Sequence, residues 1–376
     1  MIALTILGTT TGIILGLIPG IHPNNIAPLL ITLPLTTSNI TVFAASAVTS
    51  FTLASHIPSI LIGAPSGENL SVLPGHKLTR KGKGITAINL TLKGSLIAIL
   101  FTPFIALSYS VFSEKLYPAL SSLIPIFLIL VTLSMIKNKK SALVVTLAAL
   151  LGSTALENIT IMPMLTGLFG TSTLITALRK KRKIKKQEIH PDTEKQSWKT
   201  TRSATLSTAL SSILGIIPAI SSAVAATIGK KLGEMDEKEY LSFIGASNTT
   251  YIVASFLALI YIGKTRSGTT VALSTLKYPQ NPLLIVTTIM TSTAISYIIL
   301  KKNLGRIAHT MNKINIRKSN LAALILIILL NLYLTNLKGM IVLITSTAIG
   351  ITTIYLKVPR INTMSCLTIP TALLLL

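Results

Sequence analysis

The fold is decided by a motif that occurs twice: residues 14–21 read ILGLIPGI, and residues 213–220 read ILGIIPAI, about 199 positions later. A second pair of matching stretches follows, at residues 54–67 and 254–268. Both pairs place Gly, Pro and Ser inside apolar segments, where these residues interrupt helices. In membrane transporters, broken helices at corresponding positions of two halves are the best sequence indication of a binding site at the bilayer midplane. The sequence therefore predicts a duplicated transporter.

Composition places most of the chain in lipid. Half of the 376 residues are hydrophobic, only 12% are charged, and the mean hydropathy is +0.70. A soluble domain carries about 25% charged residues. The formal net charge of +24 would indicate nucleic-acid binding in a soluble protein, but the basic residues here flank apolar segments. That placement is typical of membrane topology signals, so we expect membrane lipids as partners and no nucleic acid.

The constellations of residues needed for enzyme chemistry are missing from the sequence. The single cysteine, Cys366, excludes a disulfide framework and a cysteine-based metal site. No phosphate-binding loop, nucleophile elbow or metal-binding histidine pair occurs, and Asp192 and Asp236 lie in polar segments. The N-terminus lacks a basic region, so no removable signal peptide is expected. We expect a protein that is not an enzyme and holds no cofactor or metal, apart from a coupling Na⁺ or H⁺.

Apolar segments fall into two sets of six, most of them long enough to span a bilayer. The expected organisation is a first transmembrane repeat over 1–178, a basic cytoplasmic linker over 179–203 and a second repeat over 204–376. The predicted segments are 3–36, 41–63, 85–112, 118–136, 141–157 and 159–178, followed by 204–229, 241–263, 278–300, 319–336, 338–356 and 361–376.

The positions of lysine and arginine predict the orientation. Basic islands at 77–83, 137–140, 179–186 and 301–318 are expected in the cytoplasm. All four can lie there only if the first segment of each half enters and leaves on the same side. We therefore expect an all-α polytopic membrane protein with two inverted-topology repeats, each a re-entrant helical hairpin plus about five transmembrane helices. The expected location is a prokaryotic plasma membrane. An ordinary kinked span in place of each hairpin is the alternative.

The hairpin tips are the first candidate binding site. Prolines and glycines there free backbone N–H groups and helix N-termini, which favour an anion. Irregular backbone at membrane depth is tolerated only where it is buried in protein or lines a wet cavity. Kinks that serve only helix packing are the alternative. The candidate substrate-binding residues are Pro19, Gly20, His22, Asn24 and Asn25 in the first half, and Pro218, Ser221 and Ser222 in the second.

A second break follows the next span of each half and carries charge. Arg266 is suited to a carboxylate or phosphate, because a guanidinium donates two parallel hydrogen bonds. A charge that snorkels to the interface is the alternative. The candidate substrate-binding residues are Ser66, Gly67, Arg266, Ser267, Gly268 and Thr269. The candidates for ion coupling or charge compensation are Glu68, Lys264 and His56, of which His56 is a proton relay or a satisfied interhelical hydrogen-bond partner.

These motifs resemble the large membrane subunit, or permease, of the tripartite tricarboxylate transporters, of which this chain would be a short and divergent member. The family's GxxPGxxP element stands here at 16–23 and its LPLT-like stretch at 33–36. Its basic turn resembles GHKLTRKG at 75–82. Its second-half GLLPG and PGSGT elements resemble GIIPA at 215–219 and RSGT at 266–269, with Ala219 where the family has Gly.

The resemblance implies a secondary transporter, usually ion-coupled, that works with a small membrane subunit and an extracytoplasmic binding protein. It places substrate and ion sites at 19–25, 63–69, 218–222 and 264–269. We expect a secondary active transporter that moves a small organic anion of the carboxylate class by alternating access. A translocase of a lipid-linked polyprenyl phosphate carrier is the alternative, and a membrane scaffold that transports nothing is a third.

Overall fold

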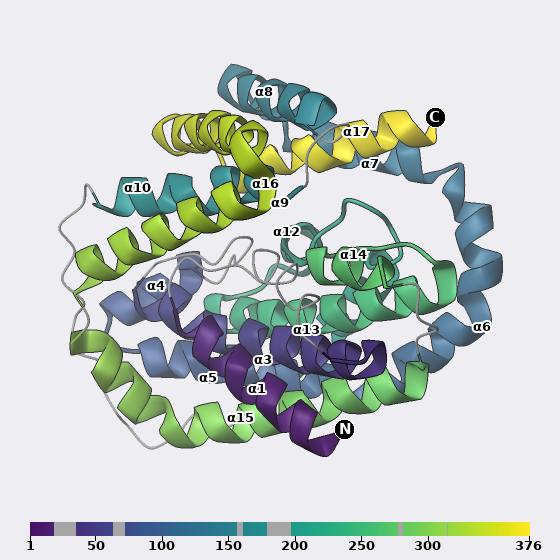
Figure 1. Ribbon diagram of the computed structural model, residues 1–376, viewed down its shortest axis with the longest axis vertical. Coiled ribbons are helices and arrows are strands. Elements are labelled where there is room, and N and C mark those ends of the chain that lie inside the picture. The colour runs from purple at the N-terminus through teal and green to yellow at the C-terminus, as the bar shows by residue number, and fades with distance from the viewer. Residues whose placement is uncertain (19–34, 63–71, 156–160, 179–196, 277–280, 314) are drawn as a thin grey trace.

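The computed structural model describes residues 1–18, 35–62, 72–155, 161–178, 197–276, 281–313 and 315–376, and over these residues the chain is helical without a strand, as predicted. The helices form two groups joined along one edge by α6 (Thr102–Ser121) (Figure 1). The first group contains α1 (Ile2–Gly16), α3 (Thr37–Leu61), α4 (Val72–Arg80), α5 (Gly84–Leu100), α11 (Trp198–Leu214), α13 (Glu237–Ile262) and α15 (Pro282–Lys313). The second contains α7 (Ile124–Met135), α8 (Lys139–Ala155), α9 (Ile161–Leu165), the π-helix η1 (Thr166–Thr171), α10 (Ser172–Leu178), α16 (Ile316–Tyr355), the 3₁₀-helix η2 (Arg360–Met364) and α17 (Ser365–Leu375). Between the groups lie α12 (Ser222–Gly233) and α14 (Gly268–Ser274).

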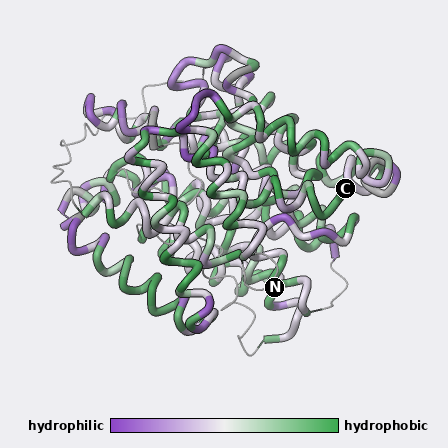
Figure 2. Tube along the Cα trace, turned by 90° about the horizontal axis from the view of Figure 1, so that it is seen from above, coloured by the Kyte–Doolittle hydropathy of each residue, from purple (hydrophilic) through white to green (hydrophobic). Residues whose placement is uncertain are grey.

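Several helices are long and apolar enough to cross a membrane. Five described helices meet this requirement, and the bent pair formed by α5 and the first part of α6, with a 47° angle between them, makes a sixth. Hydrophobic residues run along these helices, while hydrophilic residues gather mainly toward helix ends at the periphery (Figure 2). The chain is therefore a multi-pass membrane protein. The five single helices are Thr37–Leu61, Ile161–Leu178, Glu237–Ile262, Pro282–Met311 and Arg317–Tyr355.

The helix α16 contains two of the predicted segments. Its 40 residues would measure about 60 Å as one straight helix, twice the roughly 30 Å of bilayer hydrocarbon. At Asn336 the backbone leaves the helical region, with φ 53° and ψ −163°, and two arms meet at an angle (Figure 1). This kink falls between the segments predicted at 319–336 and 338–356.

The first helix of the chain packs closely on α3 through glycines. A Cβ added at Gly8 would lie 2.1 Å from the Ser46 hydroxyl, and one at Gly12 would lie 2.1 Å from the Ala47 carbonyl oxygen. Neither distance is compatible with a side chain. Small residues that let helix backbones approach are the usual basis of helix association in lipid, where burial of apolar surface drives little. The glycines of α1 therefore determine how it sits on α3.

The second half contains the same helix pair in the same register. The positions equivalent to Gly8 and Gly12, about 199 residues later, are Ser207 and Ser211 of α11. The Ser207 hydroxyl donates to the Phe243 carbonyl at 2.7 Å, and Ser211 and Ser247 share a hydroxyl hydrogen bond at 2.9 Å. Both α1 and α11 thus meet their partner helices with a small residue every fourth position.

Each long core helix also packs on a helix of the other half. The helix α3 packs against α15, and α13 packs against α5. In the second contact a Cβ on Gly245 would lie 2.0 Å from the Thr91 carbonyl oxygen, and the Ser95 hydroxyl donates to the Gly245 carbonyl at 3.0 Å. The two halves are therefore interlocked rather than placed side by side.

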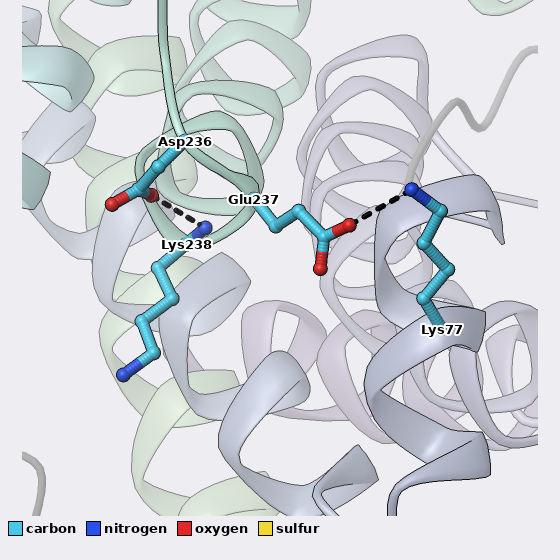
Figure 3. Close-up of polar contacts among 4 residues, drawn as sticks. All are labelled: Lys77, Asp236, Glu237 and Lys238. Carbon is cyan, nitrogen blue, oxygen red and sulfur yellow. Dashed lines mark hydrogen bonds and ion pairs between the residues drawn. The ribbon is translucent and has the colours of Figure 1, made fainter.

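The helices α3 and α13 run in opposite directions. The end of α3 shares an apolar cluster with Leu241 near the start of α13, while Ile40 near the start of α3 shares one with Leu257 and Ala258 near the end of α13. Just after α3, Lys77 of α4 forms an ion pair with Glu237 at the first turn of α13, with 2.9 Å between Nζ and Oε1 (Figure 3). Both side chains are exposed, so the pair contributes about 0–1 kcal/mol.

Some predicted boundaries differ from the structure. The segment predicted at 204–229 is divided into two helices, as a hairpin requires, but α11 already begins at Trp198, within the predicted linker, because Ser197 caps it by accepting from the Thr200 N–H. The basic turn predicted at 75–82 is largely the helix α4, in which the Thr79 hydroxyl bonds the Ile60 carbonyl. Hydropathy alone detects neither the earlier start of α11 nor the helix α4.

The helix α15 extends 13 residues beyond the predicted end of its segment at residue 300. This extension is amphipathic: Leu304 and Met311 are buried in the cluster that contains Leu78 of α4, while Lys301 and Arg306 are exposed. A basic island predicted from sequence therefore lies on a helix rather than in a loop.

Replacing Gly245 with Ala tests the close contact between α5 and α13. The added Cβ would force the two backbones apart, and overpacking of this kind costs about 1–3 kcal/mol. We expect a clear fall in the melting temperature of the purified protein in detergent. Gly170→Ala is the matched control, because its Cβ would meet only Thr166 Cγ2 at 3.7 Å. Equal melting temperatures for the two variants would show that the contact is loose.

Candidate functional site

The second-half hairpin is built around the predicted break. The helix α11 ends at Leu214, the chain passes through Pro218, and α12 begins at Ser222, with Ser221 capping it by accepting from the Val224 N–H. The hairpin closes at its base, where the Ser203 hydroxyl lies 3.3 Å from the Met235 sulfur. The chain therefore enters and leaves this hairpin at the same end.

The tip of the hairpin contains a strained residue. Ala219 has φ +60°, the left-handed region that costs a residue with a Cβ about 1–2 kcal/mol. The preceding Pro218 has its φ fixed by the ring and cannot donate a backbone hydrogen bond. The helix is thus interrupted over the whole Gly215–Ser221 segment. At position 219, glycine would adopt the observed backbone conformation without strain.

The second break begins where α13 ends. Gly263 has φ +67°, and the Lys264 N–H closes the helix on the Ala258 carbonyl at 3.3 Å. The chain then turns into α14, where the Ser267 hydroxyl and the Thr270 N–H form one bond of a capping box. The Ser255 hydroxyl in α13 donates to the Ser267 hydroxyl at 2.9 Å and fastens this loop to the core helix.

Arg266 joins the two breaks. Its Nη2 donates to the Ile216 carbonyl in the hairpin tip at 2.6 Å, and its Nη1 donates to its neighbour Thr265 at 3.2 Å. The guanidinium carbon lies 5.8 Å from the centre of the Tyr117 ring, within the range of a cation–π contact. The Nε atom is buried and has no acceptor among the described residues. The buried Nε of this partly buried cation is thus left available as a donor.

Tyrosines of two helices lie around this arginine, and the sequence analysis missed them. From α6 come Tyr117 and Tyr109, whose hydroxyl donates to the Ser212 carbonyl at 2.8 Å. From α13 comes Tyr251, whose hydroxyl donates to the Arg266 carbonyl. The tyrosines of α6 lie more than 140 residues from Arg266 in sequence, so only the fold brings them together.

A second arginine, Arg360, serves the fold by connecting helices. Arg360 donates from Nη1 to the Phe169 carbonyl at 3.1 Å and from Nη2 to the Ser172 hydroxyl at 2.8 Å. Both bonds connect η2 to the η1–α10 segment. Unlike Arg266, it has no buried nitrogen left without an acceptor among the described residues.

Two other predicted charge candidates, Lys264 and His56, lie among the described residues. Lys264 is exposed, although it stands only two residues from Arg266 in the same loop. His56 is fully buried in α3, with its Nε2 at 3.5 Å from Asn248 Nδ2 in α13. This contact joins the core helices of the two halves, as expected for an interhelical partner. No cluster of three or more metal-binding side chains occurs in the part of the chain that the structure describes.

Equivalent positions of the two core helices carry buried hydroxyls that have no hydrogen-bond partner in the described part of the chain. They are Thr49 and Ser50 in α3 and Thr249 and Thr250 in α13, about 200 residues apart, all with an exposed fraction of 0%. The Thr269 hydroxyl in α14 is also buried and unpartnered among the described residues. A buried hydroxyl without a partner costs about 1–3 kcal/mol, so these five groups call for an explanation.

The structure brings together the second-half candidates but leaves the first-half ones untested. Through the bond from Arg266 to Ile216, the tip containing Pro218, Ser221 and Ser222 is joined to the loop containing Ser267, Gly268 and Thr269. The following candidates lie outside the described residues: Pro19, Gly20, His22, Asn24, Asn25, Ser66, Gly67 and Glu68.

Comparison with known proteins decides the family. The model of the tripartite tricarboxylate transporter TctA family matches residues 2–365. The chain belongs to the TctA family. It is similar to an uncharacterized protein of Methanocaldococcus jannaschii, MJ1079, with 33% identity over 388 residues that cover 98% of this chain and 97% of the relative. No solved structure matches the chain.

Membership in the TctA family confirms the resemblance drawn from the motifs. The chain is a transporter permease and not an enzyme, and it is a multi-pass component of a membrane transport system. The family's description names tricarboxylates as its cargo. The apolar helices and the family match are independent observations, and both indicate a protein that lies in a membrane.

Replacing Ala219 with Gly tests the strain at the hairpin tip. Glycine removes the left-handed penalty of about 1–2 kcal/mol and adds a smaller entropic cost of about 0.5–1 kcal/mol. We expect an unchanged or slightly raised melting temperature in detergent, whereas Ala219→Val should lower it. A stabilising valine would mean that residue 219 is not in the left-handed region.

Proposed function

We propose that the chain is a secondary active transporter that moves a small organic anion of the carboxylate class across a prokaryotic plasma membrane by alternating access. The observation that carries this proposal is the buried Nε of Arg266, which lies at the junction of the two breaks and has no acceptor among the described residues. A guanidinium in a site of low dielectric favours an anion, and carboxylates match its geometry. The family match favours a carboxylate over a polyprenyl phosphate carrier.

The internal duplication supports alternating access by inverted repeats. The pairs α1–α3 and α11–α13 share one register of small residues, and α3 and α13 run in opposite directions. In transporters with such repeats, one repeat moves against the other around a site at their interface. The hairpin α11–α12, which returns to its starting end, would be the re-entrant hairpin of the second repeat.

The distribution of basic residues supports a cytoplasmic location for the basic islands. The contact between Lys77 and Glu237 puts the island at 77–83 beside the charged loop before α13. The cluster that joins Leu78 to Leu304 puts the basic end of α15 at the same end of the core. Three charged regions thus share one side of the protein, as a cytoplasmic face requires.

The unpartnered hydroxyls of the core helices are our candidates for coupling to Na⁺. Hard cations prefer oxygen ligands, and Thr49, Ser50, Thr249 and Thr250 supply oxygens that the described chain leaves unused. His56 and Glu68 are the candidates for coupling to H⁺ instead. A small membrane subunit and an extracytoplasmic binding protein are the proposed partners, by analogy with the tripartite family.

Cysteine labelling tests the proposed topology. With the buried Cys366 replaced by Ala, single cysteines at Thr36, Lys81 and Glu234 are each exposed enough to react. We expect a membrane-impermeant maleimide added to intact cells to label Thr36→Cys only, and the other two to require permeabilised cells. Labelling of Thr36→Cys and Glu234→Cys from the same side would contradict the inverted arrangement.

Uptake into proteoliposomes tests the role of Arg266. We expect Arg266→Gln to raise the half-saturating concentration of a transported carboxylate by about 10- to 100-fold, since a charged hydrogen bond contributes about 1.5–3 kcal/mol. Arg317→Gln is the matched control, because this arginine is exposed on α16. In the same assay, Thr249→Val should weaken the dependence of uptake on a Na⁺ gradient. Unaltered uptake by Arg266→Gln would refute the proposed site.

A further inference from the structure

We infer that the preferred substrate carries a single carboxylate on an apolar body, in contrast to the tricarboxylates named in the family's description. This inference rests on the proposed function and specifies the substrate class of the same site. Three observations lead to it: the charge of the four breaks, the number of donors that Arg266 has left, and the apolar and aromatic residues around its guanidinium.

The four breaks carry little positive charge. Segments 16–25 and 215–222 contain no Lys, Arg, Asp or Glu, 63–69 contains only Glu68, and 263–269 contains only Lys264 and Arg266. Lys264 is exposed and Glu68 lies outside the described residues, so the described junction contributes the single positive charge of Arg266. Because an ion moved into a low-dielectric site is costly unless it is compensated, a trianion would leave two charges without a protein partner. A monoanion is balanced.

Arg266 offers one open edge of its guanidinium. Its Nη1 and Nη2 each donate one of their two hydrogens, to the Thr265 and Ile216 carbonyls, and Nε has no acceptor among the described residues. Nε and an adjacent Nη hydrogen form one edge of the guanidinium, which accommodates one carboxylate. The exposed Lys264 lies outside this arrangement. The geometry therefore provides for one acidic group.

The surroundings of the guanidinium are suited to an apolar body. The Tyr117 ring stacks on Arg266, and Tyr109, Ile216 and Leu273 belong to one apolar cluster with Tyr117 packed against it. A second or third carboxylate would have to be desolvated against these rings. An aliphatic or aromatic group would instead bury apolar surface there, which contributes about 25 cal/mol per Å².

Thermal stabilisation of the purified full-length protein tests the inference. The probes are benzoate, phenylacetate and hexanoate as monocarboxylates, then succinate, citrate and geranyl phosphate, all in the presence of Na⁺. A ligand that binds the native state raises the melting temperature by mass action. We expect the best monocarboxylate to act at concentrations at least about tenfold below those of citrate.

Two variants and a control connect the effect to the site. Arg266→Gln should abolish the shift given by the monocarboxylate. Tyr117→Leu should weaken phenylacetate by about three- to tenfold, because the ring contact is lost, while hexanoate changes less. Tyr333→Leu is the matched control, since that tyrosine is 79% exposed on α16.

The outcomes separate this inference from the proposed function. If citrate stabilises the protein as well as any monocarboxylate and Arg266→Gln abolishes its effect, the inference is wrong and the carboxylate transporter stands. If geranyl phosphate alone stabilises the protein, or no carboxylate shift depends on Arg266, both are wrong.

Discussion

Direct contact between helix backbones is the interaction on which the rest of this structure depends. In lipid, apolar side chains gain little by leaving their surroundings, so helices associate through close packing and interhelical hydrogen bonds. Gly8 and Gly12 give this contact between α1 and α3, and Gly245 gives it between α13 and α5. In the second half, serine hydroxyls occupy the equivalent positions and form hydrogen bonds with the partner helix. Glycine and serine are alternative means to the same spacing, and both hold the broken segments in place.

A break in a membrane helix creates unsatisfied backbone groups, and these groups generate the site. The carbonyl of Ile216 would lack a partner in an apolar environment, and the Nη2 of Arg266 supplies one. A guanidinium brought in for this purpose carries more donors than the backbone needs. The remaining donor at Nε is the basis of the anion site that we propose at this junction. Arg360, whose two terminal nitrogens bind a carbonyl and a hydroxyl across neighbouring helices, shows the same residue serving the fold alone.

Local features of the site could be predicted from sequence, while its composition could not. Proline and glycine determine backbone geometry over a few residues, so the breaks at Pro218 and Gly263 follow from the motif. The membership in the transporter family was predicted for the same reason, since its motifs are these breaks. Tyr109 and Tyr117 could not be assigned, because their approach to Arg266 depends on the course of α6. Nor could the sequence show that the Arg266 side chain points inward while Lys264 is exposed, because a loop has no repeating pattern of buried and exposed positions. The roles of the site residues and the inversion of the repeats remain predictions.

The length of α15 gives the protein a sensitivity to its bilayer. At 32 residues it measures about 48 Å, which exceeds a hydrocarbon thickness of about 30 Å. Its far end is held by Leu304 and Met311 on the core and presents Lys301 and Arg306 outward, where anionic headgroups attract them. Bilayer thickness and headgroup charge thus act together on the tilt of this helix. Because α15 packs on α3, the lipid composition of the membrane becomes a determinant of how the two halves meet.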